Sequence, residues 1–428
     1  MSLRGRISRL GGVSASPAKA LELRPSLDDL RERMAKVLAR SRGEDGAVPL
    51  RCPPDVDFPE LPFVAEETEH GVVHVRTRRL SAAHRIGRAP LSAAAYASPE
   101  VLALLAQDPD LGSVRPRGAL YLDTETTGLS GGTGTVAFLV GLAFFRGGWV
   151  LEQLLVRELG EEVPMLARVA ERIRGAELLV TFNGKSFDVP LLRTRFAMAR
   201  MELPPEPPHL DLVHVARRLH KARGVSCKLT SLEEHVLGFV RLDDVPSGEV
   251  SAHYLHFLRT GDTRGLVGVV DHNGLDVETM IALVGLYGEP LAETSLAAPE
   301  LVGLARTLRQ ARRLDEARGV ADRAVERGAG VEAFRARAEV AKAAGDKARA
   351  LADFEIVASE IDCKKTRLEL AKLYEHHVKA PARALEVALS GTGEGEAPAA
   401  RRRERLEAKL EKSLEGDGPL FTRSHAKK

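Results

Sequence analysis

The stretch Ala119-Leu120-Tyr121-Leu122-Asp123-Thr124-Glu125 joins an apolar run to two carboxylates that flank a threonine. Side chains two residues apart on a β-strand point to the same face. We therefore expect Asp123 and Glu125 to project together from the end of a strand, with Thr124 on the opposite face. Adjacent anions repel, and carboxylate oxygen is the preferred ligand of Mg²⁺ and Mn²⁺. The pair favours a divalent-metal site, although Asp-x-Glu taken alone is more often a solvated pair at a strand edge.

Further acidic residues follow downstream in positions that fit the same site. Leu178–Phe182 reads as a short buried strand leading to Asp188, which could be only the cap of the next helix. Gly184–Ser186 suggests a phosphate-binding loop, but Leu179 stands where that pattern requires a glycine. Asp276 lies in a late stretch of helical period. Each of these carboxylates is thus expected where a strand ends or where a helix packs on the sheet.

This order of residues resembles the DnaQ-like (DEDD) exonucleases of the ribonuclease H-like fold. Longer runs resemble one branch, the YprB-type ribonuclease H-like proteins of bacteria, over about residues 118–287. The resemblance implies an α/β domain with a mixed five-stranded sheet and helices on both faces. The matching runs are Leu122–Leu129, Gly131–Thr135, Thr181–Pro190, His209–Leu212, Lys228–Glu233 and His272–Asp276.

The resemblance also implies a set of catalytic residues and a reaction. Asp123, Glu125, Asp188 and Asp276 match the family's metal-binding carboxylates, which implies two Mg²⁺ or Mn²⁺ ions as cofactors. Two such ions support phosphodiester hydrolysis, and the family implies a 3′→5′ exonuclease on single-stranded DNA or RNA. His272 departs from the family because His-x3-Asp combines the residue of one branch with the spacing of the tyrosine branch. His272 is therefore either the general base or a helix-end histidine that bonds the backbone.

Substrate contacts are expected from basic and polar side chains near these motifs. Lys185 lies inside the second motif, and a basic cluster follows the helix that starts at Asp211; such groups pair with phosphates irrespective of sequence. Asn183 could instead only form a turn, and the cluster could be an ordinary solvated face, since the whole chain is only +2. The candidates are Thr126, Asn183, Lys185, Arg217, Arg218 and Lys228, with His220, Lys221 and Arg223 in the same cluster.

Composition sets limits on the rest of the chain. Its 428 residues suggest two or three domains, and 44% hydrophobic residues are ample for a core. The sequence contains no apolar run of membrane-spanning length, and its start lacks the apolar region of a secretory signal. Cys52, Cys227 and Cys363 are far apart, which argues against a zinc site or a disulfide framework. These features predict a cytoplasmic protein.

The segments outside the nuclease-like motifs have separate expectations. We expect residues 1–115 to form an N-terminal extension with a mobile tail, one amphipathic helix and possible strands that pack on the core, such as Val72–Arg76. Residues 116–290 should form the ribonuclease H-like exonuclease domain. Residues 391–428 are expected to be a charged, partly disordered tail.

Between these segments, residues 297–390 are rich in Ala, Arg, Glu and Leu at helical period. Ala348–Leu351 recurs as Ala382–Leu385, at the 34-residue spacing of tetratricopeptide helix pairs. The sequence therefore predicts tetratricopeptide-like repeats, with a plain helical bundle as the alternative. Because stacked repeats build surfaces that bind peptides, a protein partner is possible there. Two other functions stay open: a nucleic-acid-binding protein without turnover, and an interaction scaffold built on the repeats.

Overall fold

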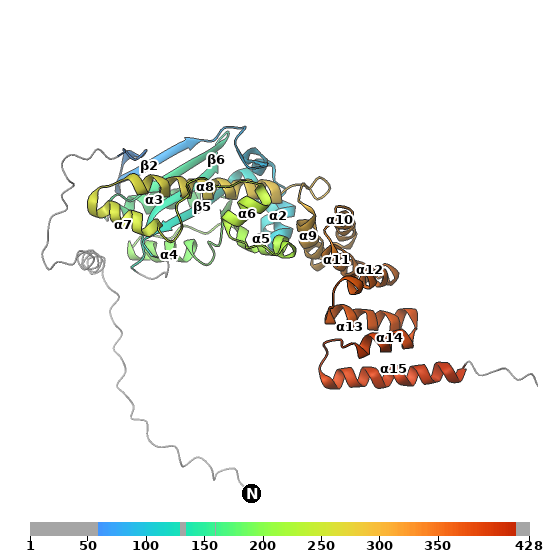
Figure 1. The fold of residues 1–428 in the computed structure, drawn as a ribbon. Coiled ribbons are helices and arrows are strands. Elements are labelled where there is room, and N and C mark those ends of the chain that lie inside the picture. The colour runs from blue at the N-terminus through green and yellow to red at the C-terminus, as the bar shows by residue number, and fades with distance from the viewer. Residues whose placement is uncertain (1–58, 129–133, 159, 417–428) are drawn as a thin grey trace, which may run out of the picture.

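The computed structural model describes residues 59–128, 134–158 and 160–416, which form an α/β domain followed by a helical module (Figure 1). The expected N-terminal tail, its amphipathic helix, most of the glycine loop that begins at Gly131 and the last twelve residues lie outside this described part. No helix in the described part is long and apolar enough to cross a membrane.

The described residues contain one large sheet of seven strands, in the order β1-β2-β7-β6-β5-β8-β9. β5 (Ala119–Thr126) pairs antiparallel with β6 (Ala137–Phe145) and parallel with β8 (Leu178–Thr181). β7 (Trp149–Leu155) continues the sheet beyond β6, and β9 (His209–Asp211) continues it beyond β8. These are the five expected strands, and β5, which carries the acidic pair, is the middle one.

Two strands from the N-terminal extension widen the sheet beyond the expected five. β2 (Gly71–Arg79) pairs antiparallel with β7, and β1 (Val64–Thr68) pairs antiparallel with β2. The strand expected at Val72–Arg76 is part of β2. Because an unpaired strand edge exposes backbone donors and acceptors, this addition also covers the edge of β7.

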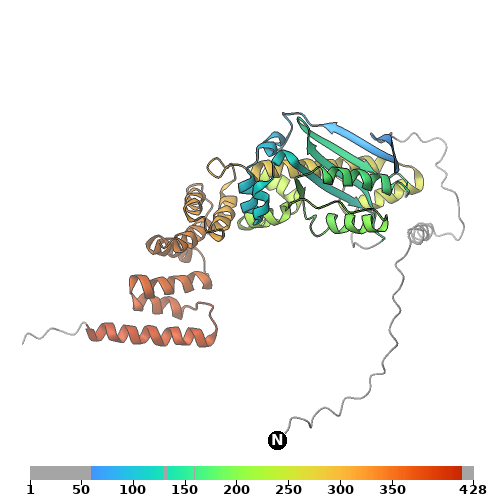
Figure 2. The ribbon, with the colours of Figure 1, turned by 180° about the vertical axis from the view of Figure 1, so that it is seen from behind.

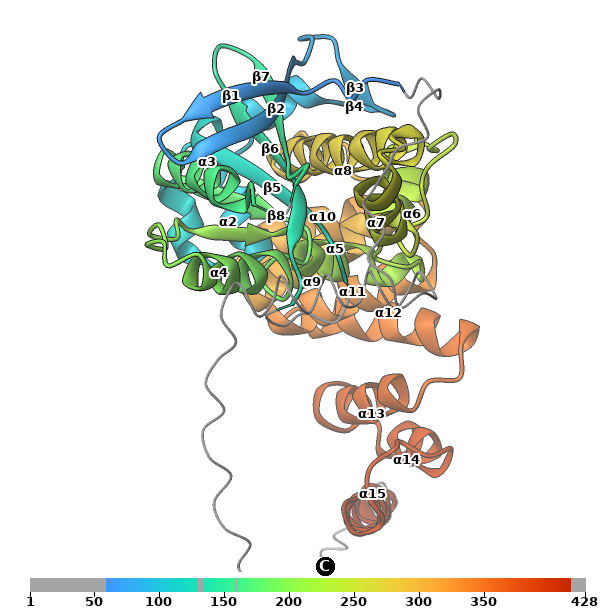
Figure 3. The same cartoon turned by 90° about the vertical axis from the view of Figure 1, so that its left-hand side faces the viewer.

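Helices cover both faces of the sheet. Successive side chains along β5 point alternately to the helices on one face and to those on the other. Leu122 packs with α3 (Glu162–Arg174) and α4 (Asp188–Met198), whereas Tyr121 packs with α8 (Arg264–Tyr287) on the other face. Figure 3 shows α3 and α4 on one side of the sheet and α8 on the other, and Figure 2 shows the face covered by α3 and α4. Asp123 and Glu125, which share the face of Tyr121, therefore lie between β5 and α8.

Shorter elements complete the α/β domain. They are β3 (Arg85–Ile86), β4 (Ala89–Pro90), η1 (Leu91–Tyr96), α2 (Pro99–Ala106), η2 (Pro109–Ser113), η3 (Pro116–Gly118), α5 (Leu212–His220), η4 (Lys221–Arg223), α6 (Leu229–Leu232), η5 (Glu233–Leu237) and α7 (Val250–Thr260).

The helical module repeats at the expected spacing. First helices of successive pairs begin at residues 298, 331 and 364, and second helices begin at 314, 347 and 381, so each pair recurs after 33 or 34 residues. This spacing agrees with the predicted repeats, and their assignment as tetratricopeptides stays a prediction. The elements are α9 (Ala298–Gln310), α10 (Leu314–Glu326), α11 (Val331–Ala343), α12 (Lys347–Glu360), α13 (Lys364–Leu373), η6 (Tyr374–Val378), α14 (Pro381–Leu389) and α15 (Glu396–Gly416).

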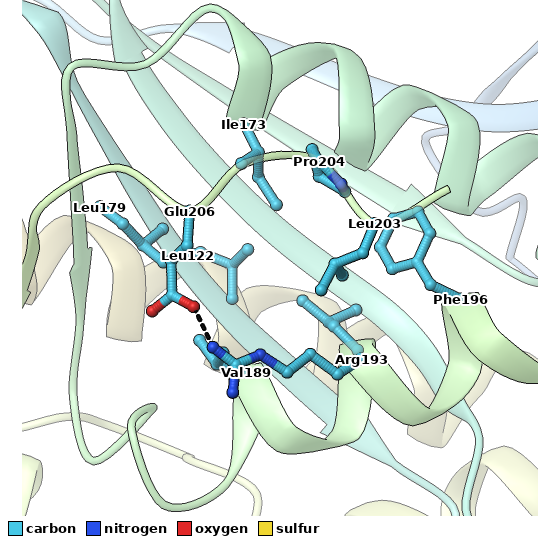
Figure 4. Close-up of a pocket in the computed structure, with 10 residues that line it drawn as sticks. Leu122, Ile173, Leu179, Val189, Arg193, Phe196, Leu203, Pro204 and Glu206 are labelled. Carbon is cyan, nitrogen blue, oxygen red and sulfur yellow. Dashed lines mark hydrogen bonds and ion pairs between the residues drawn. The ribbon is translucent and has the colours of Figure 1, made fainter. Parts of the chain in front are cut away.

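A small apolar cavity lies beneath α4, on the face of the sheet away from α8 (Figure 4). Leu122, Val189 and Leu203 line it, and the ion pair of Arg193 with Glu206 lies beside them. Its volume of about 30 Å³ is room for about one or two water molecules. The cavity is therefore a packing feature under β5 and is too small for a ligand.

Glu375 ties α15 to the rest of the module. It accepts bonds from Arg405 Nε at 2.7 Å and from Lys409 Nζ at 2.8 Å, and Arg402 lies at 3.5 Å. The bond from Arg405 is the largest cause that lowers the pKa of Glu375, to about 2. Because this pKa lies below that of an unfolded glutamate, the stabilisation is fully present above about pH 4.3 and is lost as the pH falls towards 2.

We expect Glu375→Gln to loosen α15 by about 2 kcal/mol, since it removes bonds to charged donors. Hydrogen exchange of the α15 amides at pH 7 should become faster in this variant. In the wild-type protein the same loosening should develop only between about pH 4 and pH 2. Glu404→Gln, at an exposed position of the same helix, is the control and should leave the exchange unchanged. Equal exchange in both variants would show that Glu375 does not hold α15.

Candidate active site

The two carboxylates of β5 and the threonine between them face different helices, as the strand alternation predicts. Asp123 Oδ2 accepts a hydrogen bond of 2.9 Å from Asn273 Nδ2 on α8. On the other face, Thr124 Oγ1 donates a hydrogen bond of 2.6 Å to Asp188 Oδ1, at the start of α4. The strand end is therefore held between two helices that are far apart in the sequence.

All four predicted carboxylates lie close enough to influence one another's ionisation. Burial raises the pKa of Asp123 well above its ordinary value, and Asp276, Glu125 and Asp188 raise it further. Burial also raises the pKa of Glu125 to about 7 and that of Asp188 to about 6. Burial raises the pKa of Asp276 as well, although Arg241 and His272 act in the opposite direction. The structure thus gathers these side chains into one acidic cluster, in which Asp188 is buried and the other three are half-buried.

The donor set of this cluster fits a divalent cation. Buried anions are unfavourable unless positive charge lies near them, and the groups bonded to Asp123 and Asp188, an amide and a hydroxyl, are neutral. Carboxylate oxygens are the ligands that Mg²⁺ and Mn²⁺ prefer. As the side chains stand, however, no three His, Cys, Asp or Glu residues of the described part are arranged so that they could hold a metal ion. Asp276 is bonded instead to the guanidinium of Arg241.

His272 contacts side chains of the site, which differs from the alternative of a helix-end histidine bonded to the backbone. Its Nδ1 lies 2.7 Å from Asp244 Oδ1, and its Nε2 lies 3.7 Å from Asp276 Oδ2. Arg241 Nη1 lies farther from Nδ1, at 3.3 Å, so Asp244 favours the tautomer with the proton on Nδ1. Burial alone would lower the pKa of His272, but Asp276, Asp244 and Glu125 together raise it.

Arg241 and Glu233 form a buried support for Asp276; Glu233 lies in a matching run without an assigned role, and Arg241 lies outside every run. The guanidinium donates to Glu233 through Nε at 2.7 Å and Nη2 at 2.5 Å, and Nη2 also bonds Asp276. Thr279 Oγ1 donates to Glu233 at 2.5 Å. The side chain of Arg241 is only 4% exposed. Arg241 and Asp244 lie in a loop that none of the sequence motifs includes, so their contacts become visible only in the structure.

Asn273 was part of a matching run but had no assigned role. Gln153 Nε2 donates to Val270 O at 2.7 Å and to Asn273 Oδ1 at 3.0 Å, which directs the Asn273 amide nitrogen towards Asp123. A Cβ at Gly141 would lie 2.4 Å from Asn273 Oδ1, so the close approach of β6 to α8 requires glycine there.

Asp211 positions the turn that leads to Asp188. Its carboxylate accepts bonds from the backbone amides of Asn183 at 2.7 Å and Lys185 at 3.0 Å. Asn183 has a positive φ of 68° and occupies the turn, in agreement with its structural alternative. This turn leaves Lys185 exposed and Phe187 58% exposed immediately before Asp188.

The residues of the expected basic cluster differ in their exposure and in their bonds, and Arg218 packs against another helix. Its Nη1 donates to Leu105 O on α2 at 2.8 Å, so it supports helix packing. His220 is buried, with Nδ1 at 3.1 Å from Glu300 and Nε2 at 2.7 Å from Tyr287 Oη. Arg223 also bonds Glu300 at 2.7 Å, and Thr126 Oγ1 donates to Gly128 O at 2.9 Å. The exposed members of the cluster are Arg217, Lys221 and Lys228.

Two comparisons with known proteins concern the α/β domain. Residues 120–287 match the model of the RNase_H superfamily. A stretch of 166 residues is 39% identical to the uncharacterized protein YprB of Bacillus subtilis (strain 168), and it covers 38% of this chain and 40% of that protein. The chain therefore matches about two fifths of the length of this relative.

The matched region begins in β5, ends with α8 and contains the four carboxylates and His272. β1, β2 and the helical module lie outside it. The predicted fold class, a ribonuclease H-like α/β domain followed by an all-helical module, is confirmed. The superfamily match and the order of the strands agree that residues 120–287 form a ribonuclease H-like domain.

Proposed function

We propose that this protein is a metal-dependent nuclease that hydrolyses phosphodiester bonds of single-stranded nucleic acid from the 3′ end. The acidic cluster of Asp123, Glu125, Asp188 and Asp276, whose pKa values are raised by partial burial and mutual repulsion, carries this proposal. The match to the RNase_H superfamily supports phosphodiester hydrolysis as the reaction class. The exonucleolytic direction rests on the motif resemblance to DnaQ-like enzymes.

In this proposal the four carboxylates would hold two Mg²⁺ or Mn²⁺ ions. Such ions supply an activated water and stabilise charge on the attacked phosphate and the leaving oxygen. The chain's own residues orient the carboxylates: Asn273 holds Asp123, Thr124 holds Asp188, and Arg241 holds Asp276.

Proton transfer is assigned to His272. With its Nδ1 proton bonded to Asp244, the free Nε2 faces the carboxylate side and can accept the proton of the attacking water. Asp244 then stabilises the imidazolium that forms, as a carboxylate beside histidine does in other general-base pairs. The raised pKa of His272 has the same cause, because the surrounding carboxylates favour the charged ring.

The direct test is nucleotide release from 3′-labelled single-stranded DNA and RNA of one sequence, in Mn²⁺ and in EDTA. We expect single nucleotides to appear only with the metal. The substrate that is degraded faster shows whether the protein prefers DNA or RNA. Asp123→Asn should release far fewer nucleotides, and Asp271→Asn is its matched control. Asp271 lies on α8 beside His272, but it pairs with Arg76 and is 60% exposed. Release of internal fragments instead of single nucleotides would show that the protein is an endonuclease. Absence of cleavage of both substrates would overturn the proposal.

Phe187 offers a stacking surface beside this site. An exposed aromatic ring next to buried carboxylates can stack on an unpaired base, and the exposed Lys185 can pair with a phosphate. We expect Phe187→Ala to raise KM roughly tenfold, since stacking contributes about 1–3 kcal/mol per base, with little change in kcat. Steady-state kinetics on a short single strand measures both constants.

Tyr96→Ala is the control for Phe187→Ala, because Tyr96 is also an exposed aromatic, at 74%, and η1 carries none of the site residues. Its KM should stay within twofold of wild type. An unchanged KM in the Phe187 variant would remove this residue from the substrate path.

A second candidate function is nucleic-acid binding without turnover. The bond of Arg241 to Asp276 favours it, because a guanidinium there competes with a metal ion for a carboxylate oxygen. In that case, wild-type protein would retain single strands in a gel-shift assay but release no nucleotides in Mn²⁺.

A further inference from the structure

A cavity of about 280 Å³ lies beside the first residues of β5, towards the opposite end of this strand from the carboxylates. Leu120 lines the cavity, and Asp123 follows three residues later, roughly 10 Å farther along the strand. The other walls are the end of β6, the turn that follows it and the last turn of α3. The cavity is therefore separate from the candidate active site and shares no residue with it.

The lining of this cavity is rich in arginine. The described residues that line it include Arg117, Arg146 and Arg172, together with the carboxylate of Glu171. Glu171 lies 3.3 Å from Arg172, which also donates to Glu152 at 2.9 and 2.7 Å. These carboxylates neutralise Arg172. The positive potential of the cavity therefore comes from Arg117 and Arg146, both of which are exposed.

Arg117 and Arg146 contact aromatic rings, rather than carboxylates, in the described part of the chain. The guanidinium of Arg117 lies 4.7 Å from the ring centre of Tyr96 and 5.2 Å from that of Phe145. The guanidinium of Arg146 lies 5.7 Å from the ring centre of Phe144. A guanidinium that stacks on a ring keeps its N–H donors at its edge, where they can bond an oxygen. Because the rings also hold these side chains in place, less conformational entropy is lost when an anion binds.

Arg79 adds a further exposed cation at the same place. Its Nη1 donates to the carbonyl oxygen of Arg146 at 3.4 Å, in the turn between β6 and β7. We call Arg79, Arg117 and Arg146 the arginine surface. Guanidinium groups bond phosphate through parallel N–H donors, and several of them on one surface can contact successive phosphates of a strand.

We propose that the arginine surface binds single-stranded nucleic acid away from the strand end held at the carboxylates, an inference that rests on the proposed function because the ligand is the same substrate. Bases stack on aromatic rings and on guanidinium planes. Phe144 and Phe145 are only half-buried, so the surface can contact bases as well as phosphates. An acidic peptide would match the charge of this surface but would not use the rings.

The proposal requires a strand that is long enough to reach both places. Helices cover both faces of the sheet, so the strand must pass around the domain. At 3.4 Å per stacked nucleotide, four nucleotides span roughly 14 Å and twenty span roughly 70 Å. We therefore expect only the longer strand to contact the carboxylates and the arginine surface together.

Binding of fluorescein-labelled oligothymidylate to the full chain in EDTA tests the proposal without turnover. Fluorescence anisotropy measures Kd for the twenty-nucleotide strand at several salt concentrations. The double variant Arg117→Gln/Arg146→Gln should bind this strand roughly tenfold more weakly than wild type. The slope of log Kd against log salt should fall by roughly 1.4, because two phosphate contacts are lost.

Arg318→Gln is the control for the loss of positive charge, because Arg318 lies on α10, is 52% exposed and does not line the cavity. Its Kd should stay within twofold of wild type. Arg79→Gln, at an exposed position of β2, is a second variant in case the double variant disturbs folding, which a melting curve detects, and it should weaken binding as well.

Hydrolysis of the four-nucleotide strand in Mn²⁺ separates this proposal from the nuclease proposal. The KM for that strand should be unchanged in the double variant, because so short a strand does not reach the arginine surface. A wild-type protein that releases no nucleotides would contradict the nuclease alone, since the binding assay contains no metal. Unchanged binding of the long strand by the double variant and Arg79→Gln, or equal displacement of that strand by polyglutamate, would overturn the arginine surface as a nucleic-acid site.

Discussion

Replacing Asp123 with asparagine is expected to lower phosphodiester hydrolysis by roughly 10³-fold or more, since the metal ions stabilise the transition state by several kcal/mol. The same change should raise the melting temperature of the metal-free protein at pH 8. Burial and three neighbouring carboxylates raise the pKa of Asp123 well above its ordinary value, so its ionised form destabilises the fold. Asparagine has the same shape and its oxygen can still accept the bond from Asn273.

The sign of this stability effect depends on pH. A carboxyl group whose folded-state pKa is raised favours folding at low pH, and this advantage disappears as the pH rises through that pKa. The variant should therefore differ little from wild type at pH 4 and be more stable at pH 8. Thermal melting at both pH values measures the difference, with Asp271→Asn as the control. A variant that melts lower than wild type at pH 8 would contradict the electrostatic argument.

Mn²⁺ should stabilise the wild-type protein more strongly at pH 8 than at pH 6. Glu125 and Asp188, with pKa values of about 7 and 6, must lose their protons to act as ligands, so binding releases protons. A ligand that binds only the folded state raises the melting temperature, which makes the shift a readout independent of turnover. In Asp123→Asn this shift should largely vanish, and an unchanged shift would place the metal elsewhere.

His272→Ala is expected to lower kcat by roughly 10²–10⁴-fold, the usual contribution of a positioned acid–base group. Metal-dependent stabilisation should remain, because the carboxylates are unchanged. Asp276→Ala should instead weaken both turnover and the Mn²⁺-induced shift in melting temperature. Single-turnover cleavage, measured beside thermal melting, separates these two patterns.

His272→Tyr distinguishes proton transfer from the positioning of water. Tyrosine occupies this spacing in one branch of the DnaQ-like exonucleases, so a tyrosine variant that retains activity would make positioning the shared requirement. Full activity of His272→Ala between pH 6 and 9 would assign the whole reaction to the carboxylates. Asp244 would then have no catalytic consequence, and its bond to the imidazole would serve only packing.

The sequence alone was sufficient to predict those features of the fold that depend on a short-range pattern of residues. The apolar run before Asp123 predicted β5, and the two-residue period of a strand placed Asp123 and Glu125 opposite Thr124. The recurrence of Ala348–Leu351 at Ala382–Leu385 predicted helix pairs that the structure contains at the same spacing. These features depend on neighbours within a few residues or on a regular repeat, which the chain displays directly.

Contacts between distant segments were settled only when the chain folded. Asn273 reaches Asp123 because Gln153 orients its amide, and Arg241 holds Asp276 through a loop that carries no motif. The sequence predicted Arg218 only as a phosphate contact, and its Nη1 bond to a carbonyl of α2 became visible only in the folded chain. Hydrogen bonding and burial join residues regardless of their separation in the chain, so the supports of the carboxylates are a property of the tertiary structure.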